Sequence, residues 1–139
     1  MKTKLLLLII CISTLSCIWT KSQKENTSQI KNGVEVLYFH AKQRCATCMA
    51  IENNTKALLD ESFSKEINDS LIVFRSLEIT ENPEIARKHQ VSFSSLIIVD
   101  IENGKEAPVN LTDYAFSKAR TSPDTFKDEL RATILKMLE

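Results

Sequence analysis

Two cysteines separated by two residues are the feature of this chain most suited to chemistry. Cys45 and Cys48 lie in the stretch RCATCM, between the apolar run VEVLYFHA and a segment with helical spacing. Side chains three positions apart in the first turn of a helix lie on one side of it, within reach of a disulfide. A disulfide that closes so short a loop adds little stability. The spacing therefore favours a redox-active pair over a structural cross-link.

Two other interpretations of the pair stay open. Cys45, Cys48 and His40 could together supply three ligands for zinc or copper(I). Against this, the chain has only one further histidine, His89, and no second CxxC or CxxH motif. The remaining interpretation is two small buried thiols without chemistry.

The residues around the pair predict different roles for the two cysteines. Cys45, nearest the start of the helix, faces unsatisfied backbone N–H groups and the positive end of the helix dipole, which favour the thiolate. Arg44 adds a cation, so Cys45 is the expected nucleophile and Cys48 the resolving thiol. His40, at the end of the preceding strand, is expected to face the dithiol. There a neutral His40 could accept a proton from Cys48, or a cationic His40 could lower the pKa of Cys45. The alternative is a histidine that is simply hydrogen-bonded at the strand end.

The elements that must position the pair follow from hydrophobic periodicity and turn signals. A CxxC at the start of the first helix, directly after a buried strand, is typical of a thioredoxin-like α/β fold with the order β-α-β-α-β-β-α. We expect right-handed crossovers, a central mixed sheet flanked by helices and a final antiparallel hairpin at ENGK. The expected elements are strands over Val34–His40, Leu71–Leu77, Ser95–Asp100 and Lys105–Leu111, a helix over Cys45–Ile67, short helices capped by Asn82 and by Thr112 or Asp113, and a last helix from Ser122.

The N-terminus resembles a targeting segment. Residues 1–17 combine a basic start, MKTK, with an apolar run that is too short for a transmembrane helix, as in an export signal. TLSC, ending at Cys17, resembles a lipobox, so we expect a lipid on Cys17, with simple cleavage or an uncleaved anchor as the alternatives. Residues 18–32 are a polar tether, expected to be disordered up to about Lys31. Residues 33–139 form the domain.

The charge composition and the cysteine count limit the classes of partner that the protein is expected to bind. The chain has 18 basic and 18 acidic residues, which predicts no electrostatic attraction to nucleic acid. Cys11 leaves with the signal and Cys17 is expected to carry lipid, so the domain keeps only the CxxC pair. Export places this pair in an oxidising compartment, the periplasm or cell envelope, where disulfides persist. No flavin-binding or nicotinamide-binding signature is present, and no cofactor is expected.

Three segments carry a resemblance to a known family: VEVLYFHAKQRCATCMAIE, VSFSSLIIVD and NLTDYAFSKARTSPDTFKDEL. They resemble a bacterial exported thioredoxin-like family labelled nitrophenyl compound nitroreductase subunit ArsF family. The resemblance implies a thioredoxin fold with a CxxC. The label also implies an association with nitroaromatic reduction or arsenic resistance, which the residues themselves do not show.

Setting the chain against thioredoxins also implies departures from them. Ser95 takes the place of their cis-proline, and a cis bond before a non-proline residue costs roughly 2.5–4 kcal/mol. We therefore expect a trans bond there, and a Ser95 hydroxyl that can reach a cysteine sulfur. Tyr38 takes the place of their buried acid, and His40 that of a tryptophan.

These observations together predict an exported, membrane-tethered thiol–disulfide oxidoreductase that acts on protein disulfides or dithiols. One alternative is a binding module that holds a soft metal or arsenic(III) through the two thiolates without catalysis. Another is an accessory subunit of a redox or resistance system.

Overall fold

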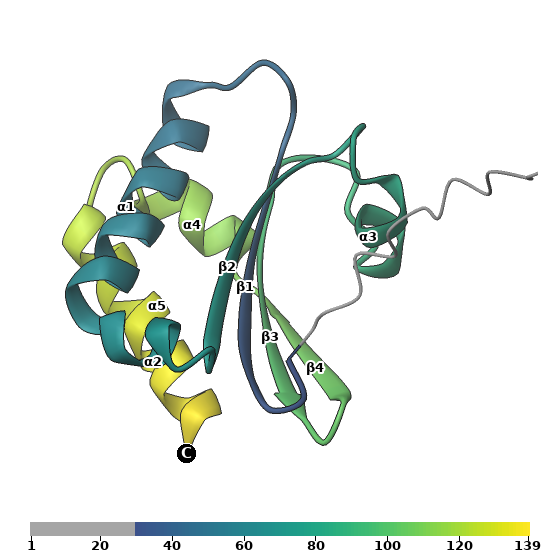
Figure 1. The fold of residues 1–139 in the computed structure, drawn as a ribbon. Coiled ribbons are helices and arrows are strands. Elements are labelled where there is room, and N and C mark those ends of the chain that lie inside the picture. Colours follow the sequence, from purple (N-terminus) through teal and green to yellow (C-terminus); the bar gives the residue numbers. More distant parts are fainter. Residues whose placement is uncertain (1–29) are drawn as a thin grey trace, which may run out of the picture.

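The computed structural model of the chain describes residues 30–139. The predicted export signal, Cys17 and most of the predicted tether lie outside these residues. Four strands form a single mixed sheet in the order β2-β1-β3-β4, with β1 and β3 in the centre (Figure 1). The strands are β1 (Gly33–His40), β2 (Ile72–Glu78), β3 (Ser95–Glu102) and β4 (Lys105–Asn110).

The strands differ in direction. β1 runs parallel to β2 and antiparallel to β3, and β3 and β4 form an antiparallel hairpin. The hairpin turn uses Asn103 and Gly104 with φ of 52° and 76°, as expected for an Asn-Gly turn. The hairpin and the mixed sheet are thus confirmed. A crossover through α1 and α2 joins the parallel strands β1 and β2, whereas the connection that contains α3 returns the chain antiparallel to β1.

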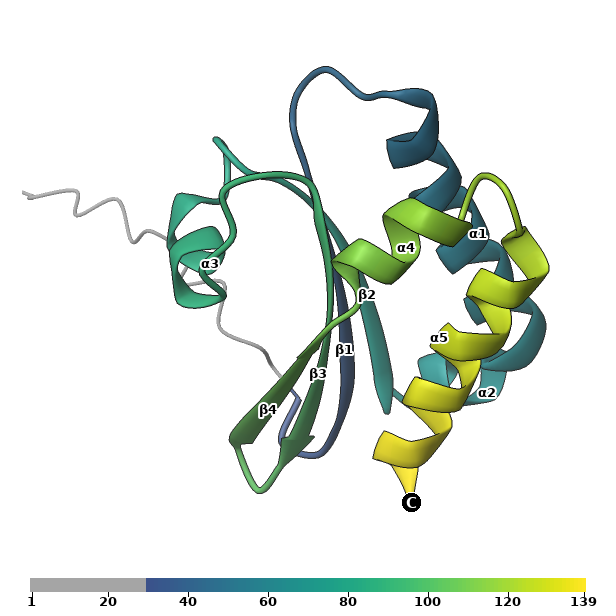
Figure 2. The same ribbon diagram turned by 180° about the vertical axis from the view of Figure 1, so that it is seen from behind.

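Helices cover both faces of the sheet unequally. Figures 1 and 2 show α3 alone on one face and the other helices on the opposite face. None of the helices within residues 30–139 is both long and apolar enough to cross a membrane. The helices are α1 (Ala46–Ser62), α2 (Ser64–Asn68), α3 (Pro83–Lys88), α4 (Thr112–Lys118) and α5 (Pro123–Leu138).

The first helix is shorter than predicted. The chain leaves helical geometry at Phe63 (φ −133°, ψ 22°), which divides the expected helix over Cys45–Ile67 into α1 and α2. The aromatic ring of Phe63 is buried in the core. A continuous helix would keep this residue on the helical path, so the break is the local adjustment that accompanies its burial.

The predicted side-chain caps are also wrong. Asn82 occupies the position before α3 but makes no cap bond, and its side-chain amide donates instead to the carbonyl of Glu78 at 2.9 Å. Thr112 lies inside α4, where Leu111 holds the cap position. The buried Thr112 hydroxyl accepts from Leu96 N–H at 3.1 Å. Both side chains therefore connect the helix starts to the sheet region rather than to their own helices.

β1 divides the core in two. Because successive side chains of a strand point to opposite faces, Val36 and Tyr38 enter the cluster under α1 and α5, while Leu37 and Phe39 enter the one under α3. All four side chains are fully buried. The alternation also directs His40 to the same face as Tyr38, the face that carries α1 and the CxxC.

The chain is already anchored before β1 begins. Ile30 packs against the cluster under α3, the Lys31 carbonyl accepts from Gly104 N–H at 3.1 Å, and Asn32 accepts from Asn103 N–H at 2.7 Å. The last residues of the predicted tether are thus bound to the hairpin turn, which the polar composition did not indicate.

Candidate functional site

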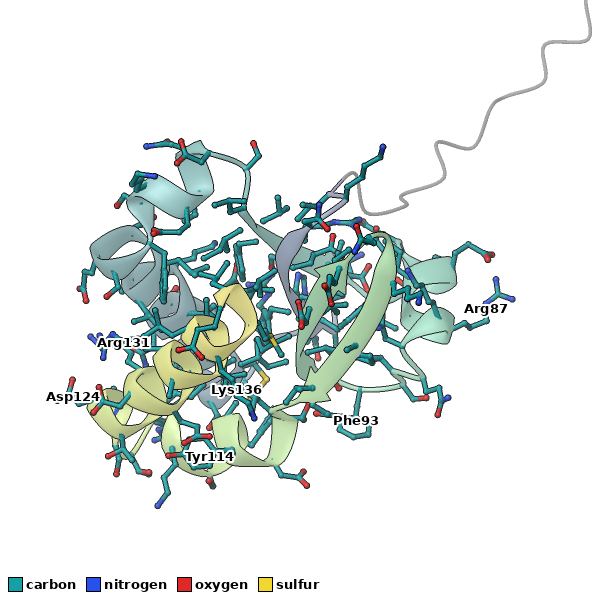
Figure 3. The ribbon with its side chains drawn as sticks, turned by 90° about the horizontal axis from the view of Figure 1, so that it is seen from below. Arg87, Phe93, Tyr114, Asp124, Arg131 and Lys136 are labelled. Carbon is teal, nitrogen blue, oxygen red and sulfur yellow. A yellow bond between two sulfur atoms is a disulfide. The ribbon has the colours of Figure 1, made fainter. Side chains whose placement is uncertain are left out.

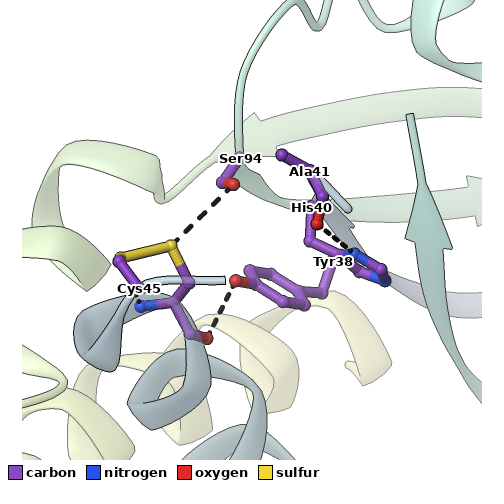
Figure 4. The surroundings of a disulfide bond; sticks show 6 residues. Tyr38, His40, Ala41, Cys45 and Ser94 are labelled. Atoms are coloured by element: carbon purple, nitrogen blue, oxygen red, sulfur yellow. Dashed lines mark hydrogen bonds between the residues drawn. A yellow bond between two sulfur atoms is a disulfide. The ribbon is translucent and has the colours of Figure 1, made fainter. Parts of the chain in front are cut away.

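The CxxC forms a disulfide at the start of α1. Cys45 and Cys48 are bonded, with their Cα atoms 5.0 Å apart (Figure 4). Cys45 is the N-cap residue, and its sulfur accepts a hydrogen bond from Cys48 N–H at 3.1 Å. The predicted place of the pair at the N-terminus of the first helix is confirmed. A sulfur that already accepts a backbone N–H as the disulfide can be stabilised by the same donor as a thiolate.

The two cysteines differ in access. Cys45 is exposed, whereas Cys48 is only 6% exposed and lies one turn further along α1. A reagent from solution therefore meets the sulfur of Cys45 first. This asymmetry supports the expected order, in which Cys45 exchanges with a partner and Cys48 resolves the product.

Tyr38 lies beneath the pair. Its fully buried ring comes from β1, and its hydroxyl donates to the carbonyl of Cys48 at 2.8 Å. Burial raises the pKa of Tyr38 to about 12; the nearby Arg44 charge lowers it and Glu52 raises it. Tyr38 therefore stays protonated at neutral pH and fastens the first turn of α1 to the sheet. It does not act as the proton-accepting acid whose place the resemblance assigns to it.

The buried phenol predicts a pH effect. In a Tyr114→Phe protein Tyr38 is the only tyrosine left, and we expect tyrosinate absorbance to rise with a midpoint at about pH 12. Because the folded state holds this proton more tightly, folding stability is complete below about pH 10 and is lost as the pH rises towards 12. Adding Tyr38→Phe should remove this pH dependence and cost about 1 kcal/mol through the lost hydrogen bond. A midpoint near 10 would contradict the burial.

Arg44 does not point at Cys45, which differs from the expectation. Its guanidinium donates to the carboxylate of Glu52 on α1 and contacts Nε2 of His40. Among residues 30–139, no hydrogen bond joins Arg44 to either cysteine sulfur. The cation is thus engaged by a buried anion, and the helix N-terminus remains the source of positive potential at Cys45.

His40 is held by two contacts. Its Nδ1 lies 3.1 Å from the carbonyl of Ala41 (Figure 4), and its Nε2 contacts Arg44. Because a guanidinium only donates, Nε2 must accept, which places the ring proton on Nδ1. In this arrangement both ring nitrogens are occupied, and in the described part of the chain neither cysteine is a hydrogen-bond partner of His40. The geometry favours a hydrogen-bonded histidine at a strand end over a proton acceptor for Cys48.

Ser94, not Ser95, faces the disulfide. The hydroxyl of Ser94 lies 4.0 Å from Sγ of Cys48, whereas the buried Ser95 hydroxyl donates to the carbonyl of Phe93 at 2.8 Å. The expected contact of the Ser95 hydroxyl with a cysteine sulfur is therefore wrong, and the hydroxyl of the preceding Ser94 lies there instead. The bond before Ser95 is trans as expected, since residues 30–139 contain no cis peptide bond.

The different partners of the two hydroxyls predict different effects of substitution at Ser94 and Ser95. Ser94→Ala should slow the resolution of a mixed disulfide a few-fold, because the hydroxyl that can donate to the Cys48 thiolate is lost, and should leave stability nearly unchanged. Ser95→Ala should cost about 1 kcal/mol of stability through the lost hydrogen bond to Phe93 and should leave resolution unchanged. Mixed-disulfide lifetimes and urea unfolding separate the two outcomes. Slower resolution in Ser95→Ala alone would restore the predicted role of the Ser95 hydroxyl.

Glu52 is the residue at this site that sequence reasoning missed. It is 5% exposed and binds Arg44 together with Lys56, whose Nζ lies 2.7 Å from its Oε1. Burial by itself raises the pKa of Glu52, but hydrogen bonds from Lys56 and Ser76 and the charge of Arg44 outweigh it, and the net shift is downward. Its position four residues after Cys48 places it on the same helix face, which is the signal that could have identified it.

The described residues provide no ready metal site. Within 30–139, no group of three or more histidine, cysteine, aspartate and glutamate side chains is arranged to hold a metal ion. Of the ligands considered, the two cysteines are joined to each other and His40 faces Arg44. A metal would therefore require reduction of the disulfide and rotation of the histidine.

Comparisons with known proteins find likeness in structure only. No family model and no curated protein matches the chain. The solved structures that resemble it include a thioredoxin from Fasciola hepatica, with 24% identity, a TM-score of 0.49, and coverage of 77% of this chain and 83% of that one. The thioredoxin Deadhead of Drosophila melanogaster has 17% identity and a TM-score of 0.48, with coverage of 76% and 81%. Trxlp from Edwardsiella tarda has 18% identity and a TM-score of 0.48, with coverage of 71% and 82%.

The topology of the chain itself determines the fold. A central β1 lies between a parallel β2 and an antiparallel β3, a hairpin forms the edge, and the helix that follows β1 begins with a CxxC. The chain thus has a thioredoxin-like fold, and the Cys45–Cys48 pair at the expected place supports a function in thiol–disulfide redox chemistry.

Proposed function

We propose that the protein is a thiol–disulfide oxidoreductase that acts on protein partners. The observation that carries this proposal is the disulfide at the N-cap of α1, with Cys45 exposed and Cys48 buried. A purely structural disulfide would have no need of this asymmetry. An exchange catalyst requires one sulfur that a partner can reach and a second that stays close to it.

The exchange follows from this geometry. In the reducing direction, the Cys45 thiolate attacks a partner disulfide, whose S–S bond breaks and whose leaving sulfur departs as a thiolate. The Cys48 thiolate then attacks Sγ of Cys45, which re-forms the intramolecular disulfide and releases the second partner thiolate. The partner gains two electrons and the Cys45–Cys48 dithiol loses two. Oxidation of a partner dithiol is the same sequence in reverse.

Apolar side chains beside the motif support a protein partner. Met49, next to Cys48, is 48% exposed, and Phe93, next to Ser94, is 66% exposed. Figure 3 shows the ring of Phe93 extending from the surface. Exposed apolar groups next to Cys48 and next to Ser94, whose hydroxyl faces the Cys48 sulfur, can contact the residues that flank a partner's cysteine.

Catalysed reduction of a protein disulfide tests the activity. With dithiothreitol as the electron source, the protein should accelerate the reduction of insulin, and a Cys45→Ser/Cys48→Ser protein should not. If the unmodified protein gives no acceleration but binds one equivalent of zinc or arsenic(III) when reduced, the thiolate-binding alternative replaces the oxidoreductase.

The export signal and the predicted lipid on Cys17 extend this proposal to a protein tethered in the cell envelope. The resemblance to the ArsF family adds a proposed association with a redox or resistance system. Fractionation tests the location: the full-length protein should be recovered in membranes, with a mature N-terminus at Cys17 and added lipid mass. An unprocessed chain in the soluble cytoplasmic fraction would contradict the tethered location.

A further inference from the structure

A buried carboxylate lies behind the redox pair. Glu52 has only 5% of its surface exposed, and its two oxygens are divided between two cations: Oε2 binds Arg44 and Oε1 binds Lys56. Ser76, on β2, donates to it as well. A buried charge with several partners is stable as an anion, so Glu52 supplies a fixed negative charge on the α1 face that carries the cysteines.

The position of Arg44 makes this charge relevant to the chemistry. Arg44 directly precedes Cys45 in the chain, and its flexible side chain is long enough to approach a thiolate at that position. In the structure it turns inwards to Glu52 and His40 instead, with its side chain 30% exposed. Lys56 does not offer a replacement, because it stands over the ring of Phe74 at 5.8 Å from its centroid.

We propose that Glu52 is a positioning residue that withholds Arg44 from Cys45 and thereby limits the thiolate fraction of Cys45. This inference rests on the proposed function and deepens it. With Glu52 ionised, the positive charge of the Arg44 guanidinium is compensated by the carboxylate, and the guanidinium is directed away from the Cys45 sulfur. Without this anchor, the guanidinium is free to pair with the Cys45 thiolate, which stabilises the reduced protein and makes the disulfide a stronger oxidant.

The size of the effect follows from the general influence of a neighbouring opposite charge on a thiolate. An opposite charge within about 4–6 Å of a thiolate lowers the pKa of the thiol. At pH values below that pKa, the thiolate fraction then rises roughly tenfold or more. A more stable thiolate is also a weaker nucleophile, with a Brønsted coefficient of about 0.5, so the net gain in reaction rate is roughly threefold. The equilibrium constant with glutathione should move by up to roughly tenfold towards the dithiol.

A double-mutant cycle in the full chain tests the proposal. The rate at which iodoacetamide alkylates Cys45 is measured in the reduced protein at slightly acidic pH, with mass spectrometry to identify the modified thiol. Glu52→Gln should increase this rate roughly threefold. Adding Arg44→Gln should remove the increase, so that Arg44→Gln/Glu52→Gln matches Arg44→Gln alone. Glu61→Gln makes the same charge change on exposed surface of α1 and should have no effect.

Glu52→Asp provides a second variant if Glu52→Gln does not fold. The shorter side chain keeps the negative charge but holds it further from the guanidinium of Arg44. We therefore expect a smaller increase in the alkylation rate of Cys45. The proposal is overturned if no folded Glu52 variant alkylates faster, or if the increase persists without Arg44. Alkylation requires no disulfide exchange, so a protein that fails to reduce insulin but shows this cycle would sink the proposed function and keep the inference.

Discussion

Replacing Cys45 with serine is expected to reduce the rate of disulfide exchange to the uncatalysed rate. The hydroxyl of serine does not form a disulfide, and Cys48 is too buried to take over the attack on a partner. Cys48→Ser should instead accumulate a mixed disulfide at Cys45, because the attacking sulfur remains and the resolving one is gone. The trapped species should appear on non-reducing gels of cell extracts and should disappear with dithiothreitol.

Cys45→Ser and Cys48→Ser are matched controls for each other. Both variants remove the Cys45–Cys48 disulfide, so a difference between them reports the roles of the two sulfurs and not the loss of the cross-link. If Cys45→Ser trapped a partner and Cys48→Ser did not, the assigned roles would be reversed. If both retained exchange, the dithiol would not be the site of the chemistry.

Replacing Phe126 with alanine is expected to cost about 3–5 kcal/mol of folding stability. Phe126 is fully buried in the cluster between α5 and the sheet. Its truncation removes apolar contacts and leaves a cavity that the surrounding side chains fill only in part. Urea unfolding followed by circular dichroism gives the change in free energy.

Leu135→Ala is the control on the same helix. Leu135 is 49% exposed, so its truncation should change stability by no more than about 0.5 kcal/mol. A loss below about 1 kcal/mol for Phe126→Ala, or similar losses for both variants, would contradict the packing of α5 against the sheet.

The strands and the hairpin could be predicted because their signals are local. The apolar run before the CxxC indicated a buried central strand, and Asn103-Gly104 indicated the tight turn between β3 and β4. The position of the cysteines at a helix start followed from the same pattern. Local patterns could not predict the direction of β3. Its antiparallel return depends on how α3 packs, and no residue in the short α3 segment indicates that packing.

The errors at the site have a common cause. Sequence adjacency predicts that Arg44 acts on Cys45, whereas the buried Glu52 decides where the guanidinium points. β3 begins at Ser95 as predicted, but the sequence does not show which of the two adjacent serine hydroxyls, Ser94 or Ser95, turns towards the dithiol. The resemblance gives Tyr38 the place of a buried acid near the second cysteine; the structure puts its hydroxyl on the Cys48 carbonyl, and strand alternation is the local feature that directs it to this face.

Titration of the pair against glutathione redox buffers tests the central claim most directly. The fraction of protein with free Cys45 and Cys48 is measured by alkylation and mass spectrometry after equilibration over a range of ratios of reduced to oxidised glutathione. A redox-active pair should give a reversible transition with the same midpoint from either direction, with both thiols appearing together. A pair that stayed fully oxidised or fully reduced over the whole range would contradict the account.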